Sequence, residues 1–378
     1  MAAVPESGFL LVADLTGYTA YLASGEIEHA PTIAGDLLET IVGRLEPPYR
    51  LAKLEGDAAF LFVEDGRADG SLLLDSIEAS YLAFRRRLRS IEAATTCDCN
   101  ACRQAPRLDL KYFVHHGQFV RSRIAGRDEI AGSSVIVVHR LLKGATAAAA
   151  HNDDGRANGF AVITGEAVEA LGIGSVAVGL TAGQETIEHI GSVATFTMDL
   201  EARWQAESVE RRLGMDGAPL LDIELTLPAR PAVVWAYLTS PKLRPTWEGP
   251  IRIDEQGGDG RRGVGTTSAC VTSVLSTLEQ IVDWQPFEHA GYRLTAPGIG
   301  DVAATWDIVA EGESTRVRLR WTAASELLAG TSAVAARAAD KRRALGRLRE
   351  ALSAGTALQP PVPRSREARP PASEEVLA

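Results

Sequence analysis

Two short apolar runs, Tyr49 to Ala52 and Ala58 to Val63, constrain the fold most, because only Lys53-Leu54-Glu55-Gly56-Asp57 separates them. Apolar runs joined by a tight Gly-containing turn are typical of a β-hairpin. An earlier apolar run, Phe9 to Ala13, also ends in an aspartate, Asp14, just before a Gly-containing loop. If these strands are neighbours, Asp14 and Asp57 converge at one edge of a sheet. Paired carboxylates are hard oxygen ligands, which Mg²⁺ and Mn²⁺ prefer.

The rest of residues 5–200 alternates between helix and strand patterns. Apolar residues at helical spacing predict helices over Glu28–Leu45, Ser71–Ala93, Ser133–Lys143 and Thr164–Leu171. Further strands are predicted over Leu108–His115 and Phe119–Ile124, as a second hairpin around Gly117, and over Val193–Leu200. This order is that of a ferredoxin-like α+β domain. The arginines of the second helix are interpreted as a solvated face: Arg85, Arg86, Arg87 and Arg89.

A different pattern begins after a charged connector, residues 201–218. The stretch Leu221–Leu227 alternates strictly, as a half-buried strand does, and Pro231 opens a short helix. Several strands follow, of which Thr315–Trp321 is the clearest, and a long helix over about Gly330–Ser353 closes the domain. We therefore predict a second domain at residues 219–355. The tail, residues 356–378, is rich in Pro, Arg and Glu and is predicted to be disordered.

Charge and composition exclude several classes of protein. The chain has 378 residues, a formal net charge of −10 and a hydrophobic fraction of 46%, which favours globular cores over a nucleic-acid-binding surface. It contains no signal-peptide pattern and no apolar run near the ~18 residues of a membrane helix. We expect a soluble cytoplasmic protein with no nucleic-acid partner and no membrane span. Four cysteines argue against a disulfide framework.

The stretches Phe9–Tyr18 and Lys53–Asp57 together resemble class III nucleotidyl cyclases, in an uncharacterised bacterial branch. The resemblance implies that Asp14 and Asp57 bind Mg²⁺ or Mn²⁺, which activate the ribose 3′-hydroxyl and stabilise charge on the α-phosphate. Lys53 matches a position that contacts the base of the nucleoside triphosphate. The alternatives are that each Asp only caps a turn, and that Lys53 is a solvated strand residue.

A later segment, residues 127–140, resembles the second cyclase region. Glu129 matches the acidic base-reading position, and Arg140 matches the catalytic arginine that stabilises the pentavalent phosphorus. Ile136 stands where the family has Asn, and the late phosphate-binding Lys has no counterpart at residues 187–191. These departures predict very slow turnover or none. His139 beside Arg140 is either a phosphate contact or a helix-surface residue. In the resembling enzymes the site lies between two chains, so a homodimer is implied.

The second domain resembles the START-like, or polyketide-cyclase-like (SRPBCC), helix-grip family, through its opening "Leu-Pro-Ala-Arg-Pro-Ala-Val-Val-Trp" and its final helix. That resemblance implies a cavity for a hydrophobic small molecule. The residues predicted to line it, with core packing as the alternative, are Trp247, Trp284, Tyr292, Trp306 and Trp321.

The spacing of Cys97, Cys99 and Cys102 is that of a possible Zn²⁺ site, with His115, His116 or Cys270 as a fourth ligand. Free or redox-labile thiols are the alternative, and Cys270 is otherwise a core residue.

Three functions remain open from the sequence. The first is a signalling protein with a metal-dependent, nucleotide-binding domain or weak cyclase, whose second domain senses a hydrophobic ligand. The second is a non-catalytic ligand-binding or sensor protein that keeps the cyclase fold. The third is a lipid- or polyketide-processing protein in which the first domain is a scaffold. Asp14, Asp57 and Arg140 favour the first, whereas Ile136 favours the second.

Overall fold

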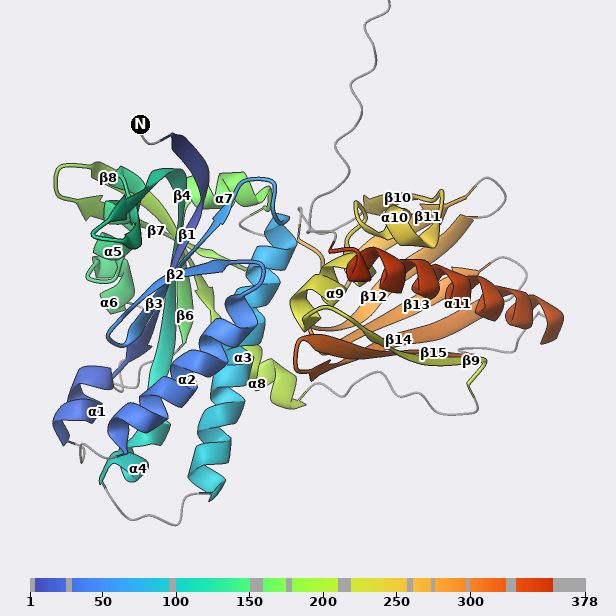
Figure 1. Cartoon of the computed structure of the whole chain (residues 1–378), viewed down its shortest axis with the longest axis horizontal. Coiled ribbons are helices and arrows are strands. Elements are labelled where there is room, and N and C mark those ends of the chain that lie inside the picture. Colours follow the sequence, from blue (N-terminus) through green and yellow to red (C-terminus); the bar gives the residue numbers. More distant parts are fainter. Residues whose placement is uncertain are drawn as a thin grey trace, which may run out of the picture.

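Two mixed units make up the chain and pack against each other along one helix, α3 (Figure 1). The computed structural model describes residues 4–24, 29–94, 100–149, 159–174, 179–209, 219–256, 261–272, 276–296, 300–323 and 331–355. The predicted tail, residues 356–378, lies outside these ranges, as does part of the predicted connector, residues 210–218.

The first unit is built on an eight-stranded sheet in the order β2-β3-β1-β4-β6-β8-β7, with β5 paired to β4. Its β4 and β6 strands are parallel, and the other neighbours are antiparallel. The strands are β1 (Pro5–Thr16), β2 (Arg50–Glu55), β3 (Ala58–Glu64), β4 (Asp109–Ile124), β5 (Arg127–Ala131), β6 (Phe160–Thr164), β7 (Thr181–Ile187) and β8 (Gly191–Asp199).

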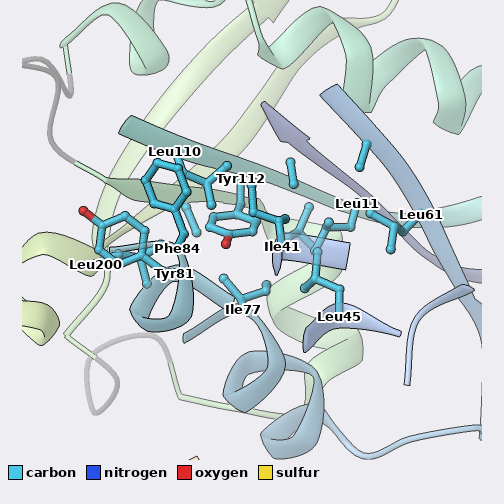
Figure 2. Close-up of a cluster of buried hydrophobic side chains, with 14 of the residues drawn as sticks. Leu11, Ile41, Leu45, Leu61, Ile77, Tyr81, Phe84, Leu110, Tyr112 and Leu200 are labelled. Atoms are coloured by element: carbon cyan, nitrogen blue, oxygen red, sulfur yellow. The ribbon is translucent and has the colours of Figure 1, made fainter. Parts of the chain in front are cut away.

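Helices cover both faces of this sheet. They are α1 (Tyr18–Ser24), α2 (Ala30–Leu45), α3 (Gly70–Ala94), α4 (Asn100–Gln104), α5 (Ser133–Leu141), α6 (Ala145–Ala149), α7 (Gly165–Leu171) and α8 (Leu200–Val209). The central strand β1 is apolar throughout its middle because its alternate side chains enter two different cores. Leu11 packs with Ile41 and Ile77 of α2 and α3 (Figure 2), whereas Leu10 packs in the cluster that contains Val138 of α5.

The second unit is a seven-stranded antiparallel sheet in the order β10-β11-β12-β13-β14-β15-β9, and the long helix α11 lies across it (Figure 1). Its elements are β9 (Leu221–Leu227), α9 (Pro231–Thr239), α10 (Arg244–Glu248), β10 (Arg252–Gln256), β11 (Thr267–Val271), β12 (Ser276–Gln285), β13 (His289–Ala296), β14 (Gly300–Glu311), β15 (Ser314–Ala323) and α11 (Thr331–Ser353). The predicted α+β class is confirmed: a mixed sheet covered by helices is followed by an antiparallel sheet with one long final helix across it.

The hairpin predicted around Gly117 is wrong. One continuous strand, β4, runs through this position, and the turn lies at Ala125–Gly126 between β4 and β5. A Cβ on residue 117 would lie 2.3 Å from the Ser134 hydroxyl and 3.2 Å from its Cβ, so glycine is favoured there by the close approach of α5 and not by a turn.

Helix α3 is buried from Ser71 to Phe84 because each unit covers one of its faces. Ile77 and Phe84 belong to the core of the first unit, whereas Leu72 and Ala79 belong to the core of the second. An apolar stripe wider than one face is the mark of a helix packed between two layers. The predicted domain boundary at residues 201–218 therefore does not separate the two cores, because α3 contributes side chains to both.

Polar groups also join the two units along α3. The two oxygens of Asp75 accept hydrogen bonds from the indole nitrogens of Trp235 (3.0 Å) and Trp284 (3.2 Å). Arg261 pairs with Glu78, and Arg262 donates to both oxygens of Asp69. Burial raises the pKa of Asp75 to about 6, despite the opposing charge of Arg261.

The arginines at the end of α3, predicted to form a solvated face, make specific contacts instead. Arg86 pairs with Glu288 of the second unit, and Arg87 binds both oxygens of Asp36. Arg85 pairs with Asp109 and Glu201, and the Arg89 guanidinium lies 4.2 Å from the centre of the Trp204 ring. None of the helices in the described ranges has the length and hydropathy needed to cross a membrane.

Candidate functional sites

The end of β1 and the β2–β3 turn bring Asp14 and Asp57 together. Asp14 is paired in register with Ala58, the residue after Asp57, and the Leu15 amide donates to the Asp57 carbonyl at 3.2 Å. Burial raises the pKa of Asp14, and the charge of Asp57 raises it further, whereas Lys111 opposes both. The hairpin and the neighbouring strand thus bring Asp14 and Asp57 to the same end of the sheet, and metal binding by the two carboxylates stays a prediction.

The sequence analysis missed Lys111, which holds Asp14 in the structure. It lies opposite Asp14 in the β1–β4 register, and its Nζ is 3.0 Å from Asp14 Oδ2. Both side chains are largely buried, at 17% and 13% exposure, so solvent screens this ion pair only weakly. A lysine within the apolar run Leu110–Val114 was the available signal, because a charge on a central strand requires a partner.

A second polar group lies on the β2 strand beside this edge. Lys53 Nζ is 3.0 Å from Glu55 and 3.6 Å from Glu129 of β5, which places the two predicted base-contacting residues together. Glu55 also accepts from His139 Nε2 at 2.9 Å. Burial would raise the pKa of Glu55, but hydrogen bonds from Lys53 and His139 hold that pKa below its usual value. His139 therefore has a partner within its own chain.

Arg140 lies one residue further along α5 and is exposed. Ile136, one helical turn earlier, is 53% exposed. Neither side chain contacts Asp14 or Asp57 among the interactions of the described residues. The predicted catalytic arginine and the predicted metal ligands thus do not form one site within a single chain.

The donor set at the sheet edge fits a hard divalent cation in part. Asp14 and Asp57 supply carboxylate oxygens, which Mg²⁺ and Mn²⁺ prefer. Among the described residues, however, no group of three or more His, Cys, Asp or Glu side chains is placed to bind a metal. Lys111 already occupies one oxygen of Asp14, so any divalent cation competes with its ammonium group.

The predicted zinc site is described only in part. Cys97 and Cys99 lie outside the described residues, and Cys102 is buried. Its Sγ lies 3.8 Å from His29 Nδ1, a histidine that the sequence analysis did not consider. The fourth ligands that it did consider have other neighbours: His115 contacts Thr164, His116 contacts Asp65, and Cys270 lies in the second unit. Zinc binding stays a prediction.

The second unit contains a partly open cavity of about 280 Å³ between its sheet and α11. Tyr292, Trp306 and Trp321 line it, whereas Trp247 and Trp284 do not, which corrects the prediction for these two residues. Trp247 donates its indole hydrogen to the Tyr237 carbonyl, and Trp284 faces Asp75 at the contact between the two units. Trp284 lies on β12 and Trp247 on α10, and an aromatic side chain carries no sequence signal for which of two apolar surroundings it enters.

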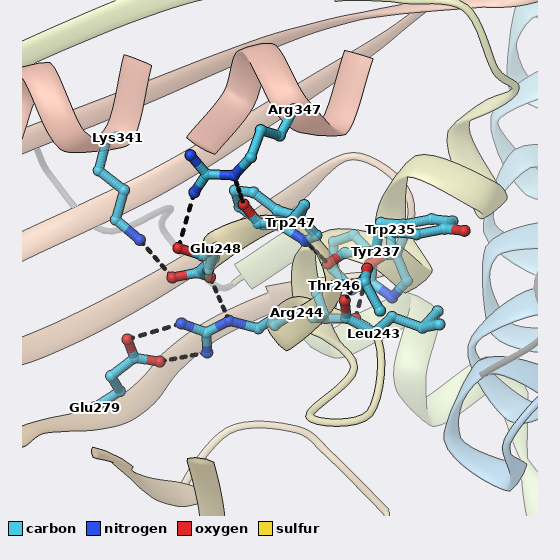
Figure 3. Close-up of polar contacts among 11 residues, drawn as sticks. Trp235, Tyr237, Leu243, Arg244, Thr246, Trp247, Glu248, Glu279, Lys341 and Arg347 are labelled. Carbon is cyan, nitrogen blue, oxygen red and sulfur yellow. Dashed lines mark hydrogen bonds and ion pairs between the residues drawn. The ribbon is translucent and has the colours of Figure 1, made fainter. Parts of the chain in front are cut away.

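A buried ionic network forms one wall of this cavity (Figure 3). Arg244 binds Glu248 at 2.7 Å and both oxygens of Glu279, at 2.6 and 3.0 Å. Lys341 of α11 binds the other oxygen of Glu248 at 2.8 Å. Although burial opposes ionisation, Arg244 and Lys341 lower the pKa of Glu248 to about 2. These four charges are therefore matched within the protein.

Two family models match the chain, one in each unit. Residues 34–150 match a model described as a protein of unknown function (DUF2652), and residues 221–353 match the polyketide cyclase/dehydrase and lipid transport model. A curated relative, an uncharacterised protein of Mycobacterium tuberculosis, is 36% identical over 107 residues. That match covers 28% of this chain and 50% of the relative, so the chain spans half the length of the curated relative that it matches.

Solved structures resemble each unit at low identity. The guanylyl cyclase Cya2 is 13% identical, with a TM-score of 0.36, over 52% of this chain and 93% of its own. The adenylyl cyclase CyaB from P. aeruginosa is 15% identical, with a TM-score of 0.38, over 57% of this chain and 100% of its own. DynU16, from the dynemicin biosynthetic locus, is 17% identical, with a TM-score of 0.31, over 37% of this chain and 49% of its own.

Proposed function

We propose that the first unit binds a nucleoside triphosphate together with Mg²⁺ or Mn²⁺, with slow cyclisation or none, and that the second unit binds a hydrophobic small molecule. The observation that carries the proposal is the convergence of two residue pairs on one sheet edge. Asp14 lies beside Asp57, and Lys53 lies 3.6 Å from Glu129. Carboxylates for a cation and a Lys–Glu pair for a base are the chemistry that a metal–nucleotide complex requires.

The residues of this edge have separable roles in the proposal. Asp14 and Asp57 hold the divalent cation, which when bound would neutralise phosphate charge and activate the ribose 3′-hydroxyl. Lys53 donates and Glu129 accepts hydrogen bonds at the edge of the base. Glu55 holds the Lys53 ammonium in position, because one of its oxygens contacts Lys53 while the other accepts from His139. Lys111 forms an ion pair with one oxygen of Asp14, which a bound cation would have to displace or share.

Turnover in this proposal requires two chains. Arg140 is exposed on α5 and turned to solvent, where a second copy can receive it. In a two-fold dimer the arginine of each chain would complete the site of the other. Ile136 offers no hydrogen bond at the neighbouring position, and loss of one such donor costs ~10²–10³ in rate. We therefore propose nucleotide binding as the main function of the first unit, with turnover slow or absent.

Calorimetry with ATP and with GTP, each with and without Mn²⁺, tests the first unit. Asp57→Asn is expected to weaken Mn²⁺-dependent nucleotide binding by ~1–3 kcal/mol, because a charged contact is lost. Glu188→Gln is the matched control, since Glu188 is an exposed carboxylate in the β7–β8 turn of the same sheet. Equal nucleotide affinity with and without Mn²⁺ in all three proteins would contradict the proposal.

The second candidate function is a sensor without chemistry. The exposed Ile136 favours it, as does the cavity of the second unit. In that case nucleotide and small molecule both bind, but no cyclic nucleotide forms after long incubation with Mn²⁺ and ATP or GTP. Accumulation of cyclic nucleotide at the rate of an ordinary cyclase would exclude it.

A further inference from the structure

One cation that lines the cavity of the second unit forms no ion pair with any described residue. Arg337 of α11 lines the cavity, and its Nη2 is buried. Among the described residues this nitrogen has no hydrogen-bond partner. A buried guanidinium nitrogen left without an acceptor loses its hydration and gains nothing in return. We therefore expect a ligand of this cavity to supply a hydrogen-bond acceptor to Arg337.

The charges around the cavity leave Arg337 unmatched. Five cationic side chains line it, against three carboxylates, so the wall has a formal excess of two positive charges. The cations are Arg244, Arg337, Lys341, Arg343 and Arg347, and the carboxylates are Glu248, Glu279 and Asp340.

Every carboxylate of this set is already paired. Arg244 binds Glu248 and Glu279, and Lys341 completes Glu248. Asp340 pairs with Arg343. The second unmatched cation, Arg347, donates to the main-chain carbonyls of Trp247 and Glu248, so its nitrogens have acceptors. Among the five, only Arg337 has a fully buried nitrogen that lacks a hydrogen-bond partner in the described part of the chain.

The opposite wall is apolar. Leu238, Leu294 and Leu319 line it with Trp306 and Trp321. Burial raises the pKa of the Cys270 thiol to about 12, so this side chain is neutral and adds no charge. At about 280 Å³ the cavity is at the lower end of the ~300–1,000 Å³ of small-molecule pockets. This volume suits one or two fused rings, or a single short chain, rather than a two-chain lipid.

We propose that the ligand of this cavity is a compact amphipathic carboxylic acid, whose carboxylate binds Arg337 and whose apolar body packs against Trp306 and Trp321. This inference rests on the proposed function of the second unit and narrows it from a hydrophobic small molecule to an organic acid. Arg337 is then the residue that determines specificity for the acid over a neutral molecule of the same shape. A charge-assisted, bidentate hydrogen bond supplies that discrimination.

Binding of 2-naphthoic acid and of its neutral amide, 2-naphthamide, to the full chain tests the inference by calorimetry. At pH 7.5 the acid is expected to bind ~10- to 100-fold more tightly than the amide. Arg337→Gln should remove this preference and leave the affinity for the amide within about twofold of the wild type. Arg337→Lys should keep part of the preference, because it keeps the charge. Arg342→Gln is the matched control, since Arg342 is exposed on the same helix and does not line the cavity.

The outcomes separate the two proposals. If acid and amide bind the wild type equally well, or if the preference survives in Arg337→Gln, the inference is wrong and the second unit remains a hydrophobic binder. If neither compound binds at millimolar concentration, the proposal that this cavity binds a small molecule is wrong, and the inference that rests on it is wrong as well.

Discussion

The two candidate sites differ in how much of their chemistry one chain supplies. At the sheet edge of the first unit, Asp14 is held by Lys111, while Arg140 lies apart on α5 and faces solvent. In the second unit, Arg244, Glu248, Glu279 and Lys341 satisfy one another in the wall of the cavity. The first site therefore needs a cation and a second chain to be complete, whereas the second needs only a small molecule. Both sites are positioned by the fold, but only in the second are the charged side chains of the network paired within one chain.

The largest expected effect is on the closed site. Arg244→Met leaves Glu279 buried without a counter-charge, so we expect the free energy of unfolding to fall by ~3–5 kcal/mol in urea. Arg318→Met is the control: Arg318 also binds both oxygens of one carboxylate, Asp222, but on the surface, where solvent screens the pair and the expected loss is far smaller. Equal losses in the two variants would show that enclosure is not what distinguishes this network.

The next effect concerns the contact between the two units. Asp75 has a pKa of about 6, above its ordinary 3.8, so the folded protein keeps a proton that the unfolded chain releases between these values. The free energy of unfolding should therefore fall by up to ~3 kcal/mol as the pH rises through 6. In Asp75→Asn this fall should disappear. Burial also raises the pKa of Asp109 to about 7, and the separate fall that Asp109 causes should persist in the variant. Unfolding curves at pH 4 and pH 8 measure both, because the fall extends from the unfolded pKa of 3.8 to the folded pKa.

A smaller effect is expected at the open site. Lys111→Met removes the ammonium that competes for Asp14 Oδ2, so Mn²⁺ should bind about five- to tenfold more tightly in calorimetry. Lys143→Met, at an exposed residue after α5, provides the control for a general change in charge. Weaker Mn²⁺ binding in Lys111→Met would mean that Lys111 orders the site instead of competing for it.

The smallest signal tests whether the open site is shared between chains. Asp57→Asn chains mixed with Arg140→Ala chains should recover part of any cyclase activity of the wild type, because one interface in the mixed dimer keeps both groups. Each variant alone should be inactive. If the wild type forms cyclic nucleotide but the mixture forms none despite verified mixed dimers, then Arg140 does not act across an interface.

Local patterns in the sequence predicted the parts of the fold that depend on neighbours along the chain. The predicted hairpin is present, although β2 continues to Glu55 and the turn is confined to Gly56 and Asp57, and α3 and α11 follow their apolar periodicity. Glycine misled the prediction at residue 117, because a turn and a close helix contact call for the same residue type.

Pairings over long distances in the chain could not be read from local patterns. Lys111 meets Asp14 only because β1 and β4 are adjacent, and Trp284 meets Asp75 only because the second unit packs on α3. The zinc prediction considered His115, His116 and Cys270, whereas the structure places His29 beside Cys102. Each of these contacts depends on the order of strands or the packing of units, which no single window of sequence contains.

The double coverage of α3 has a consequence for synthesis on the ribosome. The helix is made early, but its partners Trp235 and Trp284 follow Asp75 by 160 and 209 residues. At ~5–20 residues per second, the outer face of α3 waits roughly 10–40 s for its cover. During that interval Leu72 and Ala79 are open to water or to a chaperone, and Asp75 is free to ionise. The first unit therefore reaches its final form only when the second has been made. Until then, the face of α3 that joins the two units in the finished protein is the part of the nascent chain most exposed to aggregation.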